Sequence, residues 1–395
     1  MGSLSKIKAS NFLSLKDVTV SLGPLNVLVG PNGAGKTNFL SAIKFLGDTA
    51  RNDLIPAIET FGGFDSLRFR GSGENAPISL SVEAQFTKNA SNAAPDEYTL
   101  TITQRRFRKA RLIQRTEQFV FKRMRGRGRR ITISGETVQI VRDKNNQEEQ
   151  SLSLKETSAG LSTLRKLGRS ADSEEIERLA ILFETFRVFE VDVRAARQPS
   201  PQKEDNKLAH DARNLAAFLS WMHRAHRDAF ESIVDDMKNI LPGFKNIRLI
   251  PIGGASEGIS IAIEEDHLSG TTPLTAASFG TIRSLALLAM LHDPEPPMLT
   301  CVEEIDHGLH PYALDRIVER LREATTKTQI IVATHSPALV NRMRPNELIV
   351  CERDKSDGSS IIPAISSDVV AKMEEESGLA LGELWFSGSL GGTPE

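Results

Sequence analysis

Short apolar runs near both ends of this chain alternate with segments of helical character. The runs are too short for buried helices and too continuous for half-exposed strands, so they predict strands with both faces buried. Four runs are of this kind, at residues 25–29, 298–302, 329–333 and 347–351. An apolar stretch at 282–291 and apolar positions at helical spacing within 311–321 predict helices. Buried strands that alternate with helices are typical of an α/β fold.

The middle of the chain carries different patterns. Apolar and polar residues alternate over 99–103 and 117–121, which predicts antiparallel strands. Further on, apolar residues recur at helical spacing between Leu215 and Leu241, where Pro242 follows and ends the pattern. No heptad repeat is long enough for a coiled-coil arm.

Composition adds little to this picture. The chain has 395 residues, 39% of them hydrophobic, which is enough for two or three domains with buried cores. No apolar run approaches the roughly 18 residues of a membrane span, and residues 1–8 lack a signal-peptide core. Cys301 and Cys351 both fall in predicted strands and are expected to be reduced core residues. We therefore expect a cytoplasmic protein with no membrane partner.

Charge is unevenly distributed although its sum is small. The formal net charge is -2, yet residues 105–130 contain twelve basic residues and a single acid, Glu117. Such a density attracts phosphate backbones, so DNA is an expected partner. The alternative is a solvated face that pairs with acids elsewhere, such as residues 172–177, or with a partner protein. The expected DNA contacts lie in the glycine-containing turn at residues 125–129 and just before it: Arg123, Arg125, Arg127 and Arg129.

The first buried strand runs directly into a glycine loop. Residues 30–37 are Gly-Pro-Asn-Gly-Ala-Gly-Lys-Thr, which fits the phosphate-binding pattern G-x-x-x-x-G-K-[ST] between a strand and a helix start. In such loops backbone N–H groups surround phosphate oxygens, the lysine reaches the β- and γ-phosphates, and the threonine hydroxyl binds Mg²⁺. The pattern predicts a site for ATP and Mg²⁺ with these ligands: Asn32, Gly33, Gly35, Lys36, Thr37 and Asn38.

Two acidic residues follow the run at 298–302. Ligands bind at the carboxyl ends of strands in open α/β sheets. Glu303 is therefore expected to hold Mg²⁺, directly or through water, and Glu304 to orient and polarise an attacking water. Taken alone, the pair fits equally well as the cap of an ordinary strand.

Two further motifs share this ambiguity when taken singly. His335 follows the run at 329–333 and is a candidate to hydrogen-bond the γ-phosphate, although a histidine after a strand is more often structural. Residues 278–281, Ser-Phe-Gly-Thr, precede an apolar helix, and Ser278 with Gly280 offers either an anion site or an ordinary helix cap. The order of all four segments favours one shared ATP site.

This order of P-loop, long insertion, S-x-G-T, acidic pair and Thr-His-Ser resembles the ABC-type ATPase heads of the SMC and RecF class. It is most similar to the compact RecF-like AAA family ATPases, which include ATPase subunits of Septu-type and retron-associated phage defence and the heads of OLD-family nucleases. The resemblance covers residues 6–37, 211–241 and 275–353. Phe279 and Ile305-Asp306 depart from the Asp and Pro-Glu of the family pattern, Glu303 stands where the wider class has Asp, and only Gln85 is a weak Q-loop candidate.

The resemblance implies a fold, an activity and an assembly. The fold is an α/β, ABC/SMC-type P-loop ATPase head, a mixed sheet flanked by helices, with a β-rich basic segment and a helical insertion. The activity is ATP hydrolysis. The assembly is a homodimer, or a higher even oligomer, that sandwiches ATP so that Ser278 and Gly280 of one chain complete the site of another.

An ATPase that senses or acts on DNA, in phage defence or repair, is the function expected on these grounds. After residue 351 only residues 352–395 remain, too few for the Toprim nuclease domain of OLD-family proteins, so a separate nuclease or toxin is the expected effector. One alternative is a nucleotide-switched scaffold that sequesters such an effector. Another is the nucleotide-binding subunit of an ABC transporter. It is disfavoured by Ser-Phe-Gly-Thr in place of L-S-G-G-Q, by the missing Q-loop and by the twelve basic residues within 105–130, here called the basic block.

The expected domain plan follows the motifs. Residues 1–90 hold the first half of the ATPase head, and residues 246–355 hold the second half. Between them we expect a β-rich basic segment at 91–150 and a helical insertion at 151–245. Residues 356–395 are expected to form a tail that either docks on a partner or packs on its own head.

Overall fold

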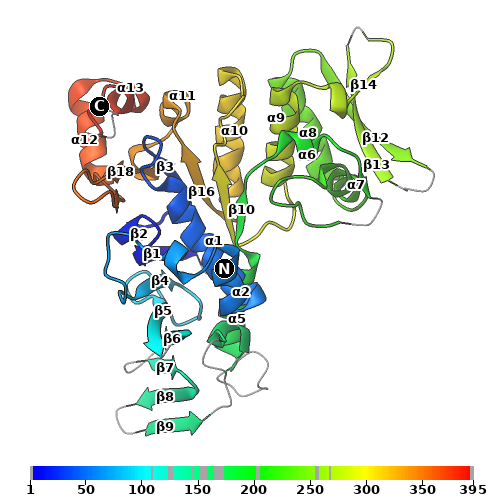
Figure 1. Ribbon diagram of the computed structural model, residues 1–395. Helices are drawn as coiled ribbons and strands as arrows, with labels where there is room; N and C mark the ends of the chain where they lie inside the picture. The colour runs from blue at the N-terminus through cyan, green and yellow to red at the C-terminus, as the bar shows by residue number, and fades with distance from the viewer. Residues whose placement is uncertain are drawn as a thin grey trace. The chain divides into compact units, whose positions relative to one another are not determined.

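The computed structural model divides the chain into two compact units (Figure 1). The first unit comprises Met1–Phe186 together with Arg344–Glu395, and the second comprises Arg187–Met343. Each unit contains strands and buried apolar side chains of its own. The structure describes residues 3–107, 110–122, 128–143, 146–151, 158–163, 173–201, 205–253, 258–266 and 268–391.

An antiparallel sheet of eight strands dominates the first unit. Its order is β2-β1-β4-β5-β6-β7-β8-β9, and every neighbouring pair is antiparallel. Buried and half-buried side chains alternate along β4, as expected where one face of a sheet covers the core. The strands are β1 (Leu4–Phe12), β2 (Leu15–Ser21), β4 (Ile78–Ala84), β5 (Asp96–Phe107), β6 (Ala110–Phe121), β7 (Arg129–Ser134), β8 (Thr137–Asp143) and β9 (Asn146–Ser151).

The predicted antiparallel pair at 99–103 and 117–121 is confirmed, and both strands are longer than the alternation indicates. In β5 and β6, Thr101 lies opposite Thr116. Successive short connections keep adding strands to the sheet that β1, β2 and β4 begin. The residues expected as a β-rich segment at 91–150 are therefore continuous with the N-terminal sheet.

Helix α1 (Lys36–Asn52) packs on α2 (Leu54–Thr60) and α5 (Ser173–Thr185) in the first unit. Its buried residues include Phe39, Ile43 and Leu46, at helical spacing. Two further helices are single turns, α3 (Phe64–Leu67) and α4 (Gly160–Thr163). The long helix that follows the glycine loop is thus fixed by its apolar face.

Two parallel strands complete the first unit near the glycine loop. β3 (Leu25–Val29) is buried along its whole length and has the predicted bounds. It pairs with β17 (Leu348–Val350), which follows the 3₁₀ turn η3 (Pro345–Glu347). Val27 lies opposite Leu348. Burial on both faces explains the largely apolar sequence of both strands, in which Asn26 is the one polar residue and is itself buried.

The C-terminal segment packs within the first unit. β18 (Glu352–Arg353) pairs with β19 (Ser360–Ile361), and α12 (Ser367–Ser377) and α13 (Leu381–Phe386) follow. Leu384 and Leu390 are buried, whereas Phe386 is 78% exposed. Of the two roles expected for this tail, packing on its own head accounts for the buried leucines.

Three parallel strands and a small antiparallel sheet lie in the second unit. β10 (Arg187–Phe189), β15 (Leu299–Glu303) and β16 (Gln329–Thr334) are adjacent in that order, with Cys301 opposite both Val188 and Ile331. The antiparallel sheet consists of β11 (Ser200–Pro201), β12 (Phe244–Ile252), β13 (Gly258–Glu265) and β14 (Thr271–Pro273). Parallel strands place their carboxyl ends at one edge, which is where the predicted site residues of this unit follow.

Helix α9 (Phe279–Leu291) is the buried centre of the second unit (Figure 1). All its residues from Thr281 to Met290 are buried, and α8 and α10 pack against it. No helix in the described part of the chain is long and apolar enough to cross a bilayer. The other helices are α6 (Val193–Ala196), α7 (Leu215–Ala225), α8 (Arg227–Ile240), η2 (Leu274–Ala276), α10 (Pro311–Ala324) and α11 (Pro337–Val340).

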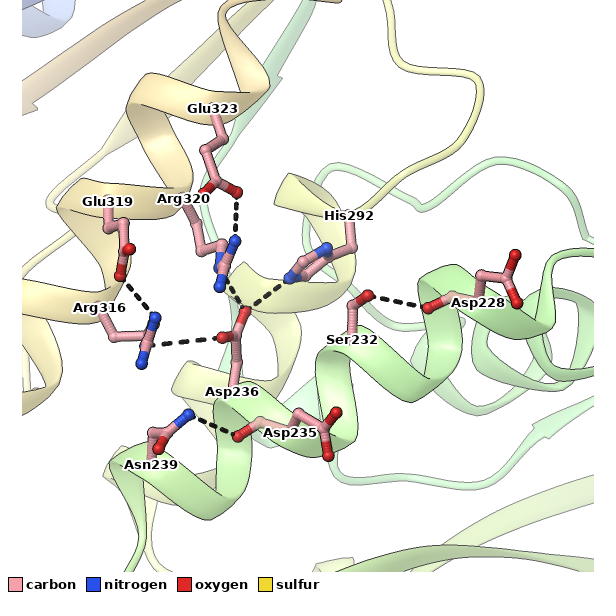
Figure 2. Close-up of polar contacts among 10 residues, drawn as sticks. All are labelled: Asp228, Ser232, Asp235, Asp236, Asn239, His292, Arg316, Glu319, Arg320 and Glu323. Atoms are coloured by element: carbon pink, nitrogen blue, oxygen red, sulfur yellow. Dashed lines mark hydrogen bonds and ion pairs between the residues drawn. The ribbon is translucent and has the colours of Figure 1, made fainter.

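Asp236 joins the three central helices of this unit (Figure 2). Its buried carboxylate hydrogen-bonds Nε2 of His292 at 2.6 Å and pairs with Nε of Arg320 at 2.8 Å and of Arg316 at 3.6 Å. Burial by itself raises the pKa of Asp236, but the bonds from His292 and Arg320 outweigh burial and hold the pKa below its usual value. The cluster ties α8 and α10 to the C-terminal end of α9.

The residue after His292 gives the second unit a pH-dependent stability. Asp293 is 8% exposed, and burial raises its pKa to about 6. The unfolded carboxyl ionises near 3.8, so stability falls as the pH rises from about 4 to about 6. Asp293→Asn replaces the buried carboxyl with an uncharged amide, so no charge is buried at any pH. We expect it to raise the free energy of unfolding by about 3 kcal/mol at pH 8 and to leave it unchanged at pH 4. Urea unfolding at both pH values measures this, and equal gains at both would contradict it.

Candidate functional site

The predicted glycine loop lies between β3 and α1 in the first unit. Gly33 and Gly35 have left-handed backbone angles, φ 81° and 99°, which residues with a side chain rarely adopt. Gly35 caps α1, and Lys36 opens its first turn. The Lys36 ammonium donates to the carbonyl oxygens of Gly30 and Pro31 at 2.7 and 3.0 Å. The amine is therefore folded back over the loop that it belongs to.

Residues from two distant segments support this loop. A Cβ on Gly35 would overlap the Ser360 hydroxyl. The Ser14 and Ser360 hydroxyls lie 2.6 Å apart, and the Asn38 amide, predicted to bind nucleotide, donates to Ser14 at 2.6 Å. Ser14 and Ser360 are site residues that the sequence patterns do not reveal. They lie 346 residues apart, so no local spacing connects them.

The loop fits a nucleotide phosphate with Mg²⁺. Asn32, Gly33 and Thr37 are exposed. The N-terminus of the 17-residue helix α1 and the Lys36 ammonium both favour an anion at this place. The Thr37 hydroxyl is an oxygen ligand of the kind that Mg²⁺ prefers.

The acidic pair lies at the carboxyl end of β15 in the second unit. Glu303 is the last residue of the strand, and Glu304 follows with φ 48°, a left-handed angle in a residue other than glycine. The Glu304 N–H donates to the Ala333 carbonyl at 2.9 Å, and its Oε2 lies 3.3 Å from Nδ1 of His307. The Glu304 side chain is 55% exposed, so its carboxylate is accessible to water.

His335 lies at the same edge of the second unit. β15 and β16 are parallel, with Glu303 opposite Ala333, so residues that follow one strand lie next to residues that follow the other. His335 is exposed, whereas Thr334 is buried and donates to Asp306 at 2.5 Å. The structure thus brings His335 and the acidic pair together.

The Ser-Phe-Gly-Thr motif meets the segment that follows the acidic pair. Ser278 is exposed and caps α9, because its hydroxyl accepts a backbone hydrogen bond from the first turn at 3.1 Å. A Cβ on Gly280 would come within 2.9 Å of the Gly308 carbonyl oxygen, so this approach requires glycine. The Phe279 ring is 46% exposed, and its centroid lies 5.5 Å from that of His307. The two motifs form one surface within the second unit.

A cleft of about 540 Å³ adjoins this surface. Its lining includes Glu303, Glu304 and three arginines, Arg194, Arg197 and Arg283. Guanidinium groups and carboxylates therefore face the same space, an arrangement able to hold a charged ligand.

Part of the basic block is structural, which corrects one predicted nucleic-acid contact. Arg129 is 4% exposed, pairs with Glu175 and lies 5.4 Å from the ring centroid of Phe121. Arg129 is therefore a core residue and is not available to DNA. The other three predicted contacts lie outside the described residues: Arg123, Arg125 and Arg127.

A second arginine of the block is also buried. Arg115 is 1% exposed, lies 3.2 Å from the Glu117 carboxylate and donates to the Ser158 carbonyl. Glu117 also accepts from the Tyr98 hydroxyl at 2.9 Å. Burial raises the pKa of Glu117, although Arg115 opposes the shift. The single acid of the block is thus a buried partner of one of its arginines.

The fold is that of an SMC-type ABC ATPase head, as expected. An SMC head bound to the C-winged helix domain of ScpA superposes with a TM-score of 0.58 and 16% identity over 93% of this chain and 99% of that one. An Smc head with an extended coiled coil, bound to the C-terminal domain of ScpA derived from Pyrococcus furiosus, superposes with a TM-score of 0.56. The sequence identity is 14%, and the match covers 96% of this chain and 100% of that one.

The chain belongs to the family described as "AAA domain, putative AbiEii toxin, Type IV TA system", whose model matches residues 25–341. The resemblance to AAA family ATPases with SMC-like heads is confirmed. ATPases of this type use a nucleotide, typically with Mg²⁺.

The curated relatives match only parts of the chain. The OLD nuclease of Thermus scotoductus is 43% identical over 58 residues, 15% of this chain and 10% of the nuclease. The retron Ec83 probable ATPase of Escherichia coli is 28% identical over 140 residues, 33% and 26% of the two chains. The chromosome partition protein Smc of Desulfitobacterium hafniense is 33% identical over 106 residues, which are 26% of this chain and 8% of that protein. The matches therefore cover well under half of each relative.

Proposed function

We propose that this ATPase is a switch that senses or acts on DNA, in which two copies close around ATP and thereby control a separate effector protein. The observation that carries the proposal is a pair of exposed helix N-termini. Lys36 and Thr37 open α1 in the first unit, and Ser278 caps α9 in the second. Both ends favour an anion. An ATP held on Lys36 of one copy can therefore be contacted by Ser278 and Gly280 of another.

Within each site we assign separate tasks to individual residues. Lys36 holds the β- and γ-phosphates. Thr37 and Glu303 are each assigned as an oxygen ligand of Mg²⁺, which would neutralise phosphate charge when bound. Glu304 orients and polarises the attacking water, and His335 hydrogen-bonds the γ-phosphate. The exposure of Glu304 and His335 at one strand edge supports these roles.

We assign the output to a separate nuclease or toxin, in anti-phage defence. The named relatives include a nuclease and a retron-associated ATPase, and the family description names a toxin. The SMC head bound to a domain of ScpA is a precedent for a partner protein on a head of this fold. Co-purification of the chain with the products of neighbouring genes, with and without ATP, tests this assignment. Identical recovery in both states would contradict control by nucleotide.

DNA binding by the basic segment is tested by removing its charge. Changing Arg123, Arg125 and Arg127 together to Gln should weaken binding about 10- to 100-fold at moderate salt. The slope of log K against log salt should become shallower by about 2 to 3, because each lost phosphate contact removes roughly 0.9. Fluorescence anisotropy with a labelled duplex at several salt concentrations measures both effects.

A matched control removes the same net charge elsewhere in the first unit. Lys44, Lys355 and Lys372 are exposed, and their joint change to Gln should leave DNA affinity close to that of the wild type. Arg129 is left intact in both variants, because its substitution would destabilise the core in which it is buried. Unchanged binding in the arginine variant, or an equal loss in the lysine variant, would rule out the basic segment as the DNA site.

A further inference from the structure

Arg283 is the one charged residue of helix α9, and it is buried. It lies in the part of α9 that is buried on all sides and is itself 4% exposed. A guanidinium taken out of water is tolerated where fixed polar groups replace the water. The groups that replace water around Arg283 therefore indicate its role.

Backbone carbonyls at the ends of two neighbouring strands replace that water. Nη2 of Arg283 donates to the Glu304 carbonyl at 2.5 Å and lies 3.4 Å from the Glu303 carbonyl, and Nη1 donates to the Val191 carbonyl at 3.2 Å. Glu303 ends β15, and Val191 follows β10. The Nε hydrogen has no acceptor within the described residues. One guanidinium thus connects two chain segments that leave the same sheet edge.

The carbonyl with the shortest of these bonds belongs to a residue in an unfavourable conformation. Glu304 has φ 48°, which is disfavoured for a residue with a Cβ and persists only where surrounding bonds impose it. Its carbonyl also accepts from the His307 N–H at 3.0 Å, and its own N–H donates to the Ala333 carbonyl at 2.9 Å. Of the three residues that bond the Glu304 backbone, Arg283 is the one that lies in a helix, α9.

We infer that Arg283 is a positioning residue that fixes the backbone of Glu304 and so sets where its carboxylate meets the attacking water. The inference rests on the role proposed for Glu304. Because α9 begins at Ser278, Arg283 also connects the Ser-Phe-Gly-Thr motif to this carboxylate within one chain. The competing explanation is that Arg283 stabilises the fold and nothing more.

The test compares Arg283→Met and Arg283→Lys with the wild type in the full chain. Steady-state hydrolysis gives kcat and KM, and a fluorescent ATP analogue gives affinity. A misplacement of about 1 Å costs roughly 100-fold in rate. We therefore expect kcat of Arg283→Met to fall about 10- to 100-fold, with KM and affinity changed less than about twofold. Arg283→Lys keeps the charge but not the two-armed donor, so its kcat should lie in between.

A double variant and a matched control separate positioning from stability. If Arg283 acts through Glu304, then Arg283→Met should cause no further loss of kcat in a Glu304→Gln background. Arg320→Met removes another largely buried arginine of the same unit, the one that pairs with Asp236. It should lower the melting temperature and leave kcat unchanged at temperatures where the protein is folded.

An unchanged kcat in Arg283→Met, or losses that multiply in the double variant, would overturn the inference. If Arg283→Met does not fold, Arg283→Lys is judged by the same criteria. Full ATP turnover by Glu304→Gln alone would refute the role proposed for Glu304 and the inference with it. Loss of turnover in Glu304→Gln with wild-type kcat in Arg283→Met would refute the inference alone.

Discussion

Glu304→Gln should slow steady-state ATP hydrolysis about 10²- to 10⁴-fold while ATP binding survives. Glutamine keeps the size of the side chain but cannot accept a proton, and a positioned general base contributes roughly 10²- to 10⁴-fold to rate. The Glu304 side chain is 55% exposed, with His307 at 3.3 Å, so the substitution should cost little stability. Phosphate release and binding of a fluorescent ATP analogue measure the two effects separately.

The same variant should hold two copies together around ATP. If hydrolysis reopens the dimer, a chain that binds ATP without cleaving it accumulates in the closed state. Light scattering after size exclusion should show twice the monomer mass with ATP and the monomer mass without it. Glu295→Gln makes the same chemical change at an exposed acid of the same unit and should hydrolyse ATP normally. A Glu304→Gln protein that stays monomeric in saturating ATP would refute the sandwich.

The strands around the site are predictable from sequence because their signal is local. The run at 25–29 becomes β3 with the same bounds, and the run at 329–333 becomes β16, one residue longer. Runs in which most residues are apolar leave no polar face, so such strands are buried on both sides. The glycine loop is equally local, since the left-handed angles at Gly33 and Gly35 are properties of single residues.

The buried arginines show where counting charges misleads. Alternate residues of a strand share a face, so Arg115 lies on the same face of β6 as Phe119. Arg129 likewise shares a face of β7 with Ile131 and Ile133. This period of two is present in the sequence and places both arginines inside. The density of positive charge in the block predicts an exposed face instead. In the structure Arg115 and Arg129 are buried, as the period of two predicts.

Contacts between distant segments are beyond any local pattern. The Ser14 hydroxyl meets Ser360 across 346 residues, and Arg283 meets Glu304 across 21. The sequence does show an isolated arginine inside the apolar stretch at 282–291, which indicates a buried charge with a purpose. What it cannot show is which carbonyl receives the charge, because only the packing of α9 beside β15 decides that.

Lys36→Ala should remove ATP binding and leave the fold intact. Lys36 is the one charged residue among residues 30–37, and its ammonium already lies 2.7 Å from the Gly30 carbonyl oxygen of the loop. Loss of one side of a hydrogen-bonded charge pair costs about 2–5 kcal/mol, which weakens ATP binding about 30- to 4000-fold. Calorimetric titration with ATP and Mg²⁺ measures the change.

Lys44→Ala is the matched control, because Lys44 is an exposed lysine of the same helix. Both substitutions introduce alanine, which favours a helix, so neither should lower the melting temperature, and only Lys36→Ala should lose affinity. Wild-type affinity in Lys36→Ala would mean that the glycine loop is not the nucleotide site. Lys36 lies in the first unit and Glu304 in the second. Loss of binding in one variant and loss of turnover alone in the other would therefore assign the two steps to different units of the chain.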